Sequence, residues 1–479
     1  MEAKFASSDS ENPVNWSKKK KAFIVAVGLI AITNSVLDSA LPSGAIDYIA
    51  KDFNVTSEVQ LALPISLYLV GYILGPLLFG PLSETYGRRV VMVPTFALFI
   101  PATLACALAP NWPFFLVFRL LCGTFASSSI AVTGGIYADI YEDSQERGRA
   151  IALYIAATAF GPQLAPAISG FVSPVSWRWA FWIGLILAGA SAAPIALLPE
   201  TFAPVILRKR TRALHRADPH VATPVIPGAA SERRTHFVTV ILARPLRMLF
   251  TEPIVLFSCL YLAFATGIFF LYFEAYPLIF QGTYGMNAGV AGLAFLPIAA
   301  GACVAFLICL LWDSILLRAK ERGLEWTKKE EFRRLPLACL GGPLYVISLL
   351  WIAWTASADI HWIVPMLSGI PFGAGFVLIF ISLLNYMADA YREYSASAAA
   401  AASCSRSVLG ALLPLAGPSM YAKLGTNWGN SLLAFLSLGM SVIPFVFIRY
   451  GDRIREGSKF SQEVLQKRER DADETTDTV

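Results

Sequence analysis

Charged residues are scarce in this sequence of 479 residues. Only 15% of the residues are charged and 56% are hydrophobic, and the mean hydropathy is +0.59. A soluble globular protein carries about 25% charged residues and about 45–50% apolar ones. A chain this apolar needs a surrounding other than water for much of its surface. The composition therefore argues against an ordinary soluble protein and favours one that is embedded in a lipid bilayer.

Motifs of nucleotide-driven and catalytic proteins are also missing. No Gly-x-x-x-x-Gly-Lys-Ser/Thr loop occurs, so ATP is not implied as an energy source. Three of the four histidines lie in one polar segment, and neither a His-Glu-x-x-His motif nor a Ser/His/Asp set is evident. The seven cysteines lie in apolar stretches without metal-ligand spacing. We expect a protein that is not an enzyme and holds no metal and no cofactor.

What the sequence does contain is a series of twelve long apolar runs. A helix that crosses a bilayer needs about 20 predominantly apolar residues. The polar residues before the first run end in four lysines without a cleavage site, which indicates a retained span and not a signal peptide. We therefore expect an all-α membrane protein with spans at 22–41, 60–80, 90–110, 113–137, 149–172, 178–198, 253–280, 288–312, 335–356, 361–386, 396–422 and 428–449.

Positive charge is distributed unevenly between the two sides of these spans. With both termini in the cytoplasm, 33 of the 38 Lys and Arg residues lie on the cytoplasmic side and three on the other. This asymmetry satisfies the positive-inside rule, and it explains the net charge of +5 without a nucleic-acid partner. The spans form two groups of six, which suggests a duplicated half. The expected domains are an N-tail at 1–21, six-helix bundles at 22–198 and 253–449, a basic linker at 199–252 and a C-tail at 450–479.

The linker and the first outer loop contain two further features. A surface helix is expected near 204–216, where a run of basic residues either binds anionic lipid or simply sets the topology. The first outer loop contains the sequon Asn54-Val55-Thr56, so Asn54 is a candidate for glycosylation.

The segment after the second predicted span carries a specific motif. Residues 80–89 read Gly-Pro-Leu-Ser-Glu-Thr-Tyr-Gly-Arg-Arg, and we expect them to form a cytoplasmic loop in which an acid and two arginines pair with a neighbouring helix end. The segment resembles the major facilitator superfamily signature Gly-x-x-x-Asp-Arg-x-Gly-Arg-Arg, with Glu84 for Asp and Thr85 for Arg as in the fungal drug:proton antiporter branch. The resemblance implies the major facilitator fold and a gating role for Gly80, Glu84, Gly87, Arg88 and Arg89.

Two other segments extend this resemblance. Residues 161–170 read Gly-Pro-Gln-Leu-Ala-Pro-Ala-Ile-Ser-Gly and look like the antiporter signature Gly-Pro-x-x-Gly-Pro-x-x-Gly-Gly. Arg119 and Gly123 in the fourth span are similar to the buried arginine motif of the family. The family implies alternating access driven by a proton gradient, with a cavity lined by the first and fourth spans of each half and their neighbours. The antiporter-like positions are Gly161, Pro162, Pro166 and Gly170.

Ionisable residues inside a bilayer are costly, so each is a functional candidate. From a rise of about 1.5 Å per residue, Asp38 lies roughly 5 Å and Arg119 roughly 9 Å below the outer ends of their spans. We expect a buried ion pair, or a pair linked by substrate or water, in which protonation of Asp38 releases Arg119. A static pair that orients helices is the alternative. Asn34 lies four residues from Asp38 on the same helical face.

Two more ionisable residues lie in the second group of spans. Glu274 is near the outer end of the seventh span among aromatic residues, so it either contacts substrate or a gate, or belongs to an interfacial aromatic belt. Arg406 lies about 15 Å into the eleventh span, where it attracts an anionic group or pairs internally.

The sequence favours a proton-coupled exporter of a small organic compound such as a drug, toxin, secondary metabolite or organic acid. An uptake symporter on the same fold and a non-transporting nutrient sensor are the alternatives. Expected partners are the small-molecule substrate, protons and the lipid bilayer, and the driving force is the proton gradient. We expect a monomer in the plasma membrane, with the vacuolar membrane as the alternative.

Overall fold

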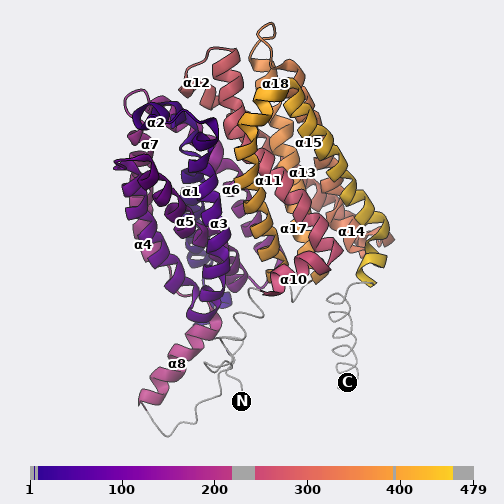
Figure 1. Cartoon of the computed structure of the whole chain (residues 1–479). Coiled ribbons are helices and arrows are strands. Elements are labelled where there is room, and N and C mark those ends of the chain that lie inside the picture. Colours follow the sequence, from indigo (N-terminus) through magenta and orange to yellow (C-terminus); the bar gives the residue numbers. More distant parts are fainter. Residues whose placement is uncertain (1–4, 6–8, 218–242, 392–394, 457–479) are drawn as a thin grey trace. The chain divides into compact units, whose positions relative to one another are not determined.

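The structure is a computed structural model, and it describes residues 5, 9–217, 243–391 and 395–456. Throughout these residues the regular secondary structure is helical (Figure 1). Two compact units are formed, and each is described separately. The first comprises Met1–Val55, Leu63–Ala165 and Val172–Leu242, and the second comprises Thr56–Ala62, Pro166–Phe171 and Ala243–Val479.

The first unit is built mainly from eight helices. Short 3-10 turns at Pro13–Asn15 and Ser43–Ala45 precede and follow the first of them. The helices are α1 (Lys18–Ala40), α2 (Ile46–Phe53), α3 (Glu58–Tyr86), α4 (Arg88–Ala107), α5 (Trp112–Ile140), α6 (Ser144–Val172), α7 (Arg178–Ala196) and α8 (Ala203–Ala217).

The second unit is built mainly from the remaining described helices, together with short segments of α3 and α6. A π-helix, η4 (Leu278–Thr283), continues α11, and a 3-10 turn lies at Glu325–Lys328. The helices are α10 (Ala243–Thr251), α11 (Pro253–Pro277), α12 (Ala288–Leu293), α13 (Leu296–Glu321), α14 (Glu330–Arg334), α15 (Pro336–Thr355), α16 (Ile363–Leu367), α17 (Gly369–Tyr391) and α18 (Ser395–Glu456).

Eleven described helical segments are long and apolar enough to cross a membrane. The last of them, Ser397–Gly451, has 55 residues and measures about 80 Å at about 1.5 Å per residue, far more than the roughly 30 Å of a hydrocarbon core. It is interrupted at Gly425, whose φ of +71° and ψ of 173° are not helical. Gly425 lies in the predicted turn between spans eleven and twelve. The described helices therefore provide twelve crossings, as predicted, in an all-α membrane fold.

The described helices differ from the predicted segments in three places. Residues 80–86 are the last turns of α3 and not a loop, because α3 continues to Tyr86. The Ser83 and Thr85 hydroxyls donate to the carbonyl oxygens of Gly80 and Pro81 in the same helix. The second group of helices continues to Glu456 instead of ending at 449, with two arginines in the last turn where the helix dipole favours positive charge. In the linker, α8 coincides with the predicted surface helix, whereas α10 was not predicted.

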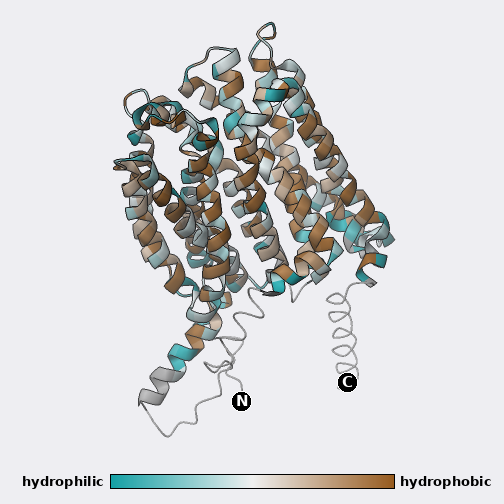
Figure 2. Cartoon of the chain, viewed as in Figure 1, coloured by the Kyte–Doolittle hydropathy of each residue, from teal (hydrophilic) through white to brown (hydrophobic). Residues whose placement is uncertain are grey.

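The long helices consist mostly of hydrophobic residues. Figure 2 shows brown along most of the long helices and teal on α8 and around α14. Several of the apolar helices touch backbone to backbone, where only glycine fits. A Cβ on Gly123 of α5 would lie 2.0 Å from the Tyr68 carbonyl oxygen of α3, and one on Gly373 of α17 would lie 2.0 Å from the Ile298 carbonyl oxygen of α13. Such close contacts fix the height of one helix against the next.

The break in α18 provides a test of the fold. Gly425→Ala should lower the free energy of unfolding by about 1–3 kcal/mol, because a side chain is strained in this backbone conformation. Gly439→Ala is the matched control, since Gly439 lies on the same element and its Cβ would meet nothing within 4 Å. Thermal unfolding of the purified variants in detergent measures the difference. Equal unfolding temperatures would contradict a glycine-specific break between two spans.

Candidate functional site

The first unit contains a fully buried ion pair. Arg119 on α5 is 0% exposed and Asp38 on α1 is 1% exposed. The Arg119 NH1 lies 3.0 Å from Asp38 Oδ2. The guanidinium also donates to the carbonyl oxygens of Asp38 at 3.1 Å, Ser39 at 3.2 Å and Pro64 at 3.0 Å. The structure thus contains the ion pair that the matched depths predict, while its role in transport stays a prediction.

The end of α1 explains why these carbonyl oxygens are available. Asp38 and Ser39 lie in the last turn of α1, where carbonyl groups lack the usual intrahelical donor. A positive charge is also favoured at the C-terminal end of a helix dipole. Arg119 therefore satisfies a helix end and a carboxylate with one planar group, which a lysine cannot do.

Aromatic rings enclose the guanidinium. Its central carbon lies 4.4 Å from the ring centre of Tyr68 and 5.8 Å from that of Phe181. The Tyr68 hydroxyl donates to the Ser35 carbonyl oxygen at 2.7 Å, and the Tyr72 hydroxyl lies 2.6 Å from Ser35 Oγ. These contacts exclude water from the pair, so its charges interact more strongly than at a surface.

One oxygen of the Asp38 carboxylate lies outside this hydrogen-bond network. Oδ1 is buried and has no hydrogen-bond partner among the described residues. On α7, a Cβ on Gly184 would lie 3.6 Å from this oxygen. A buried charged oxygen without a donor is costly. It is also the position at which a proton would bind with the least rearrangement.

Asn34 lies one turn before Asp38 and bonds to a different helix. Its side-chain amide donates to Ser191 Oγ of α7 and to the Ile30 carbonyl oxygen, both at 2.8 Å. Asn34 therefore joins α1 to α7 beside the ion pair. Its proposed part in coupling stays a prediction.

The signature at the end of α3 forms a second charge cluster. Arg88, the first residue of α4, is 7% exposed, and its Nε lies 3.1 Å from Asp139 Oδ2 on α5. Its NH1 donates to Ser83 Oγ at 2.8 Å. Glu84, which stands at the acidic position of the signature, is 4.0 Å from Arg88 and half exposed. The close acidic partner of Arg88 is thus Asp139, which sequence analysis missed.

Glu200, in the segment between α7 and α8, caps the start of α4. Gly87 precedes α4 with a φ of +112°, and a Cβ there would lie 2.3 Å from Glu200 Oε2, so both backbone and space require glycine. A carboxylate at a helix N-terminus is favoured by the dipole. It accepts hydrogen bonds at 2.8–3.2 Å from the backbone N–H groups of Arg88, Arg89, Thr201 and Phe202.

The two remaining signature residues have lesser contacts. The Arg89 guanidinium donates to the Ala196 carbonyl oxygen at 3.1 Å, which adds to the link between α4 and the end of α7. A Cβ on Gly80 would meet nothing within 4 Å, so close packing does not explain this glycine.

The second unit repeats the charge pattern of the first. Arg334, just before α15, places its Nε 2.8 Å from Asp389 Oδ2 on α17. Arg88 and Asp139 have the same relation at the start of α4 and the end of α5. Two equivalent pairs in the two halves are what a duplicated structural unit would produce.

The antiporter-like motif lies on α6 and touches the helix of the ion pair. A Cβ on Gly161 would lie 2.5 Å from Val36 Cγ2, two residues before Asp38 on α1. Glycine therefore permits α6 to approach α1 at this height. Pro162, Pro166 and Gly170 follow along α6.

Three candidate residues remain, namely Glu274, Arg406 and Asn54. Glu274 on α11 and Arg406 on α18 belong to the second unit, and both are half-buried. The Arg406 guanidinium carbon lies 4.4 Å from the Phe380 ring centre, and its Nε donates to the Ala402 carbonyl oxygen at 3.2 Å. Asn54 is exposed at the end of α2 in a left-handed conformation, and its glycosylation stays a prediction.

The cap of α4 can be tested by one substitution. Glu200→Gln should lower the free energy of unfolding by about 1–3 kcal/mol, because a charged acceptor of backbone N–H groups is lost at a helix N-terminus. Glu142→Gln, which removes an exposed carboxylate near the end of α5, is the control. Thermal unfolding in detergent measures both variants. A stability loss that is equal in the two variants would refute the capping role of Glu200.

Comparisons with known proteins agree with this architecture. The family model of the Major Facilitator Superfamily matches residues 27–414. The MFS transporter prlG of a fungal species (strain NRRL 50135) is 37% identical over 93% of this chain and 94% of its own length. The MFS-type efflux pump MFS2 of Trichophyton rubrum is 38% identical over 95% of this chain and 76% of its own length. The efflux pump FUB11 of Gibberella moniliformis is 35% identical over 97% of this chain and 78% of its own length.

A solved structure supports the same fold. The proton:xylose symporter XylE, solved with 6-bromo-6-deoxy-D-glucose, aligns with a TM-score of 0.64 over 90% of this chain and 97% of that chain. At 17% identity, this similarity shows the fold alone. Together with the family match and the fungal relatives, it confirms the resemblance that the sequence motifs indicate. The chain therefore belongs to the major facilitator superfamily and is a multi-pass membrane transporter.

Proposed function

We propose that this transporter is a proton-coupled exporter of a small organic compound and that it works by alternating access. The proton gradient is the driving force, and no cofactor takes part. The observation that carries the proposal is the buried ion pair of Asp38 and Arg119, in which one carboxylate oxygen has a donor and the other has none among the described residues.

The coupling step follows from that asymmetry. A proton that binds Asp38 Oδ1 neutralises the carboxylate and removes the charge that balances Arg119. The guanidinium keeps its bonds to the carbonyl oxygens of α1 and α3, but its positive charge is then uncompensated in a buried site. An uncompensated buried charge costs about 3–5 kcal/mol. A helix rearrangement or an electronegative substrate group that relieves this cost would link proton binding to transport.

The proposed direction of transport and the proposed substrate class rest on observations other than the ion pair. Two of the fungal relatives are named efflux pumps, and the α6 motif looks like an antiporter signature. Arg119 and the half-buried Arg406 favour a substrate with an anionic or electronegative group, within the range of drugs, toxins, secondary metabolites and organic acids. We place the transporter in the plasma membrane as a monomer, with an uptake symporter or a nutrient sensor as the alternatives that experiment must exclude.

Flux measurements in liposomes test the coupling. Purified protein is reconstituted, a pH gradient is imposed in either direction, and candidate compounds are screened for accumulation. With a transported compound, Asp38→Asn should lower gradient-driven flux at least about tenfold, because an amide cannot take up the proton and leaves Arg119 unbalanced. Exchange of labelled for unlabelled substrate at equal pH should persist.

Controls separate coupling from folding. Asp52→Asn removes a carboxylate from a half-exposed ion pair with Arg178 and should leave gradient-driven flux unchanged. If Asp38→Asn unfolds, the double variant Asp38→Asn/Arg119→Gln removes both charges and should fold without coupling. Undiminished proton-driven flux in Asp38→Asn would end the proposal. Accumulation together with protons would indicate a symporter, and no flux of any compound would indicate a sensor.

A further inference from the structure

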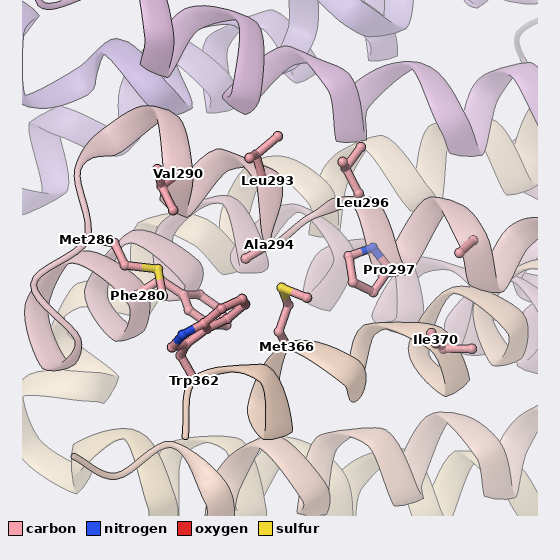
Figure 3. A pocket seen from close by; sticks show the side chains of 11 residues that line it. Phe280, Met286, Val290, Leu293, Ala294, Leu296, Pro297, Trp362, Met366 and Ile370 are labelled. Carbon is pink, nitrogen blue, oxygen red and sulfur yellow. The ribbon is translucent and has the colours of Figure 1, made fainter. Parts of the chain in front are cut away.

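The second unit contains an apolar pocket of about 440 Å³ that is separate from the ion pair and the charge clusters (Figure 3). It lies among η4, α12, the start of α13, α16 and the start of α17. Its walls include Phe280, Met286, Leu296, Trp362, Met366 and Ile370. Its volume falls within the about 300–1,000 Å³ of ordinary ligand pockets.

The wall formed by η4 has an unusual construction. Beyond α11 the backbone takes the wider π-helical form, and short π-helical segments are frequent at functional sites. The segment buries Phe280 with its ring centre 5.3 Å from that of Tyr276. Just beyond it, the Tyr284 hydroxyl donates to the Ser357 carbonyl oxygen at 2.9 Å. The ring contact with Tyr276 before η4 and the hydrogen bond of Tyr284 after it therefore hold this wall in place.

The lining determines which ligand chemistry fits. Every lining side chain is aliphatic, aromatic or a thioether, and the indole of Trp362 supplies the one side-chain N–H. Such a lining cannot compensate the desolvation of a charged or strongly polar ligand. The thioethers of Met286 and Met366 adapt to ligands of irregular shape. The chemistry fits a flexible hydrocarbon.

The surroundings of the pocket identify the source of that hydrocarbon. Two pocket residues, Leu296 and Ala300, begin a row of exposed apolar residues at helical spacing along one face of α13. On a membrane-spanning helix, an exposed apolar row is suited to contact with lipid. Trp362, at the pocket edge, is a residue type that favours the membrane interface. The row continues with Val304, Leu307, Leu311 and Ile315, which are 40–64% exposed.

We propose that this pocket binds an acyl chain of a membrane lipid. The chain enters from the lipid-facing row of α13 and occupies the space beside Phe280 and the two methionines. The site requires only a bilayer, so it does not depend on proton coupling or on the identity of the transported compound.

Photolabelling tests the site in the intact protein. The full chain is placed in nanodiscs of phosphatidylcholine with a diazirine near the end of one acyl chain, irradiated, digested and analysed by mass spectrometry. We expect labels at Met286, Trp362 and Met366 in excess over the Leu307–Ile315 part of the row. Ala300→Trp should reduce the pocket labels about fivefold or more, because overpacking a site typically costs at least about 1 kcal/mol.

The matched control is Leu307→Trp, which adds an indole to the same face of α13 away from the pocket and should leave the pocket labels unchanged. Unfolding temperatures verify that both variants fold, and Ala300→Leu replaces Ala300→Trp if the larger side chain is not tolerated. Pocket labels no stronger than those of the exposed row, or insensitive to both Ala300 variants, would overturn the proposal. Displacement of the label by a transported compound would also overturn it, since the pocket would then hold substrate.

Discussion

The burial of one guanidinium group constrains how three helices of the first unit are positioned. Arg119 can lie inside the bundle only if its donors and its charge are satisfied there, and the groups that do so come from α1 and α3. These helices must therefore meet α5 at one height. The backbone contact between Gly123 and Tyr68, one turn along α5, holds the same height by packing. Electrostatics and close packing thus specify one arrangement.

Away from this pair, several charged side chains bind at the ends of helices. Glu200 satisfies the N–H groups at the start of α4, and Arg88 joins that start to Asp139 on α5. Arg334 and Asp389 form the matching link in the second unit. Each contact joins the end of one helix to another element, so the helices on the two sides of the contact are held together.

The fold was largely predictable, and the site only in part. The twelve spans follow from hydropathy, and the Asp38–Arg119 pair follows from depth, because rise per residue is fixed in a helix. The partners Asp139 and Glu200 were not found, because they lie 51 and 112 residues from Arg88 and no local spacing links them. The helical form of residues 80–86 was missed because Gly80 and Pro81 are typical of loops, whereas both lie inside α3 in the structure.

The buried arginine also constrains how the chain is made. An arginine in a membrane helix is costly, up to about 2.5–3.5 kcal/mol at the helix centre on insertion scales, so α5 is a poor candidate to remain alone in lipid. Its partners lie on α1 and α3, which precede it in the chain and leave the ribosome first. The helices therefore enter the membrane in an order that suits assembly. The carboxylate and carbonyl groups that bind Arg119 are already in the bilayer when α5 is inserted.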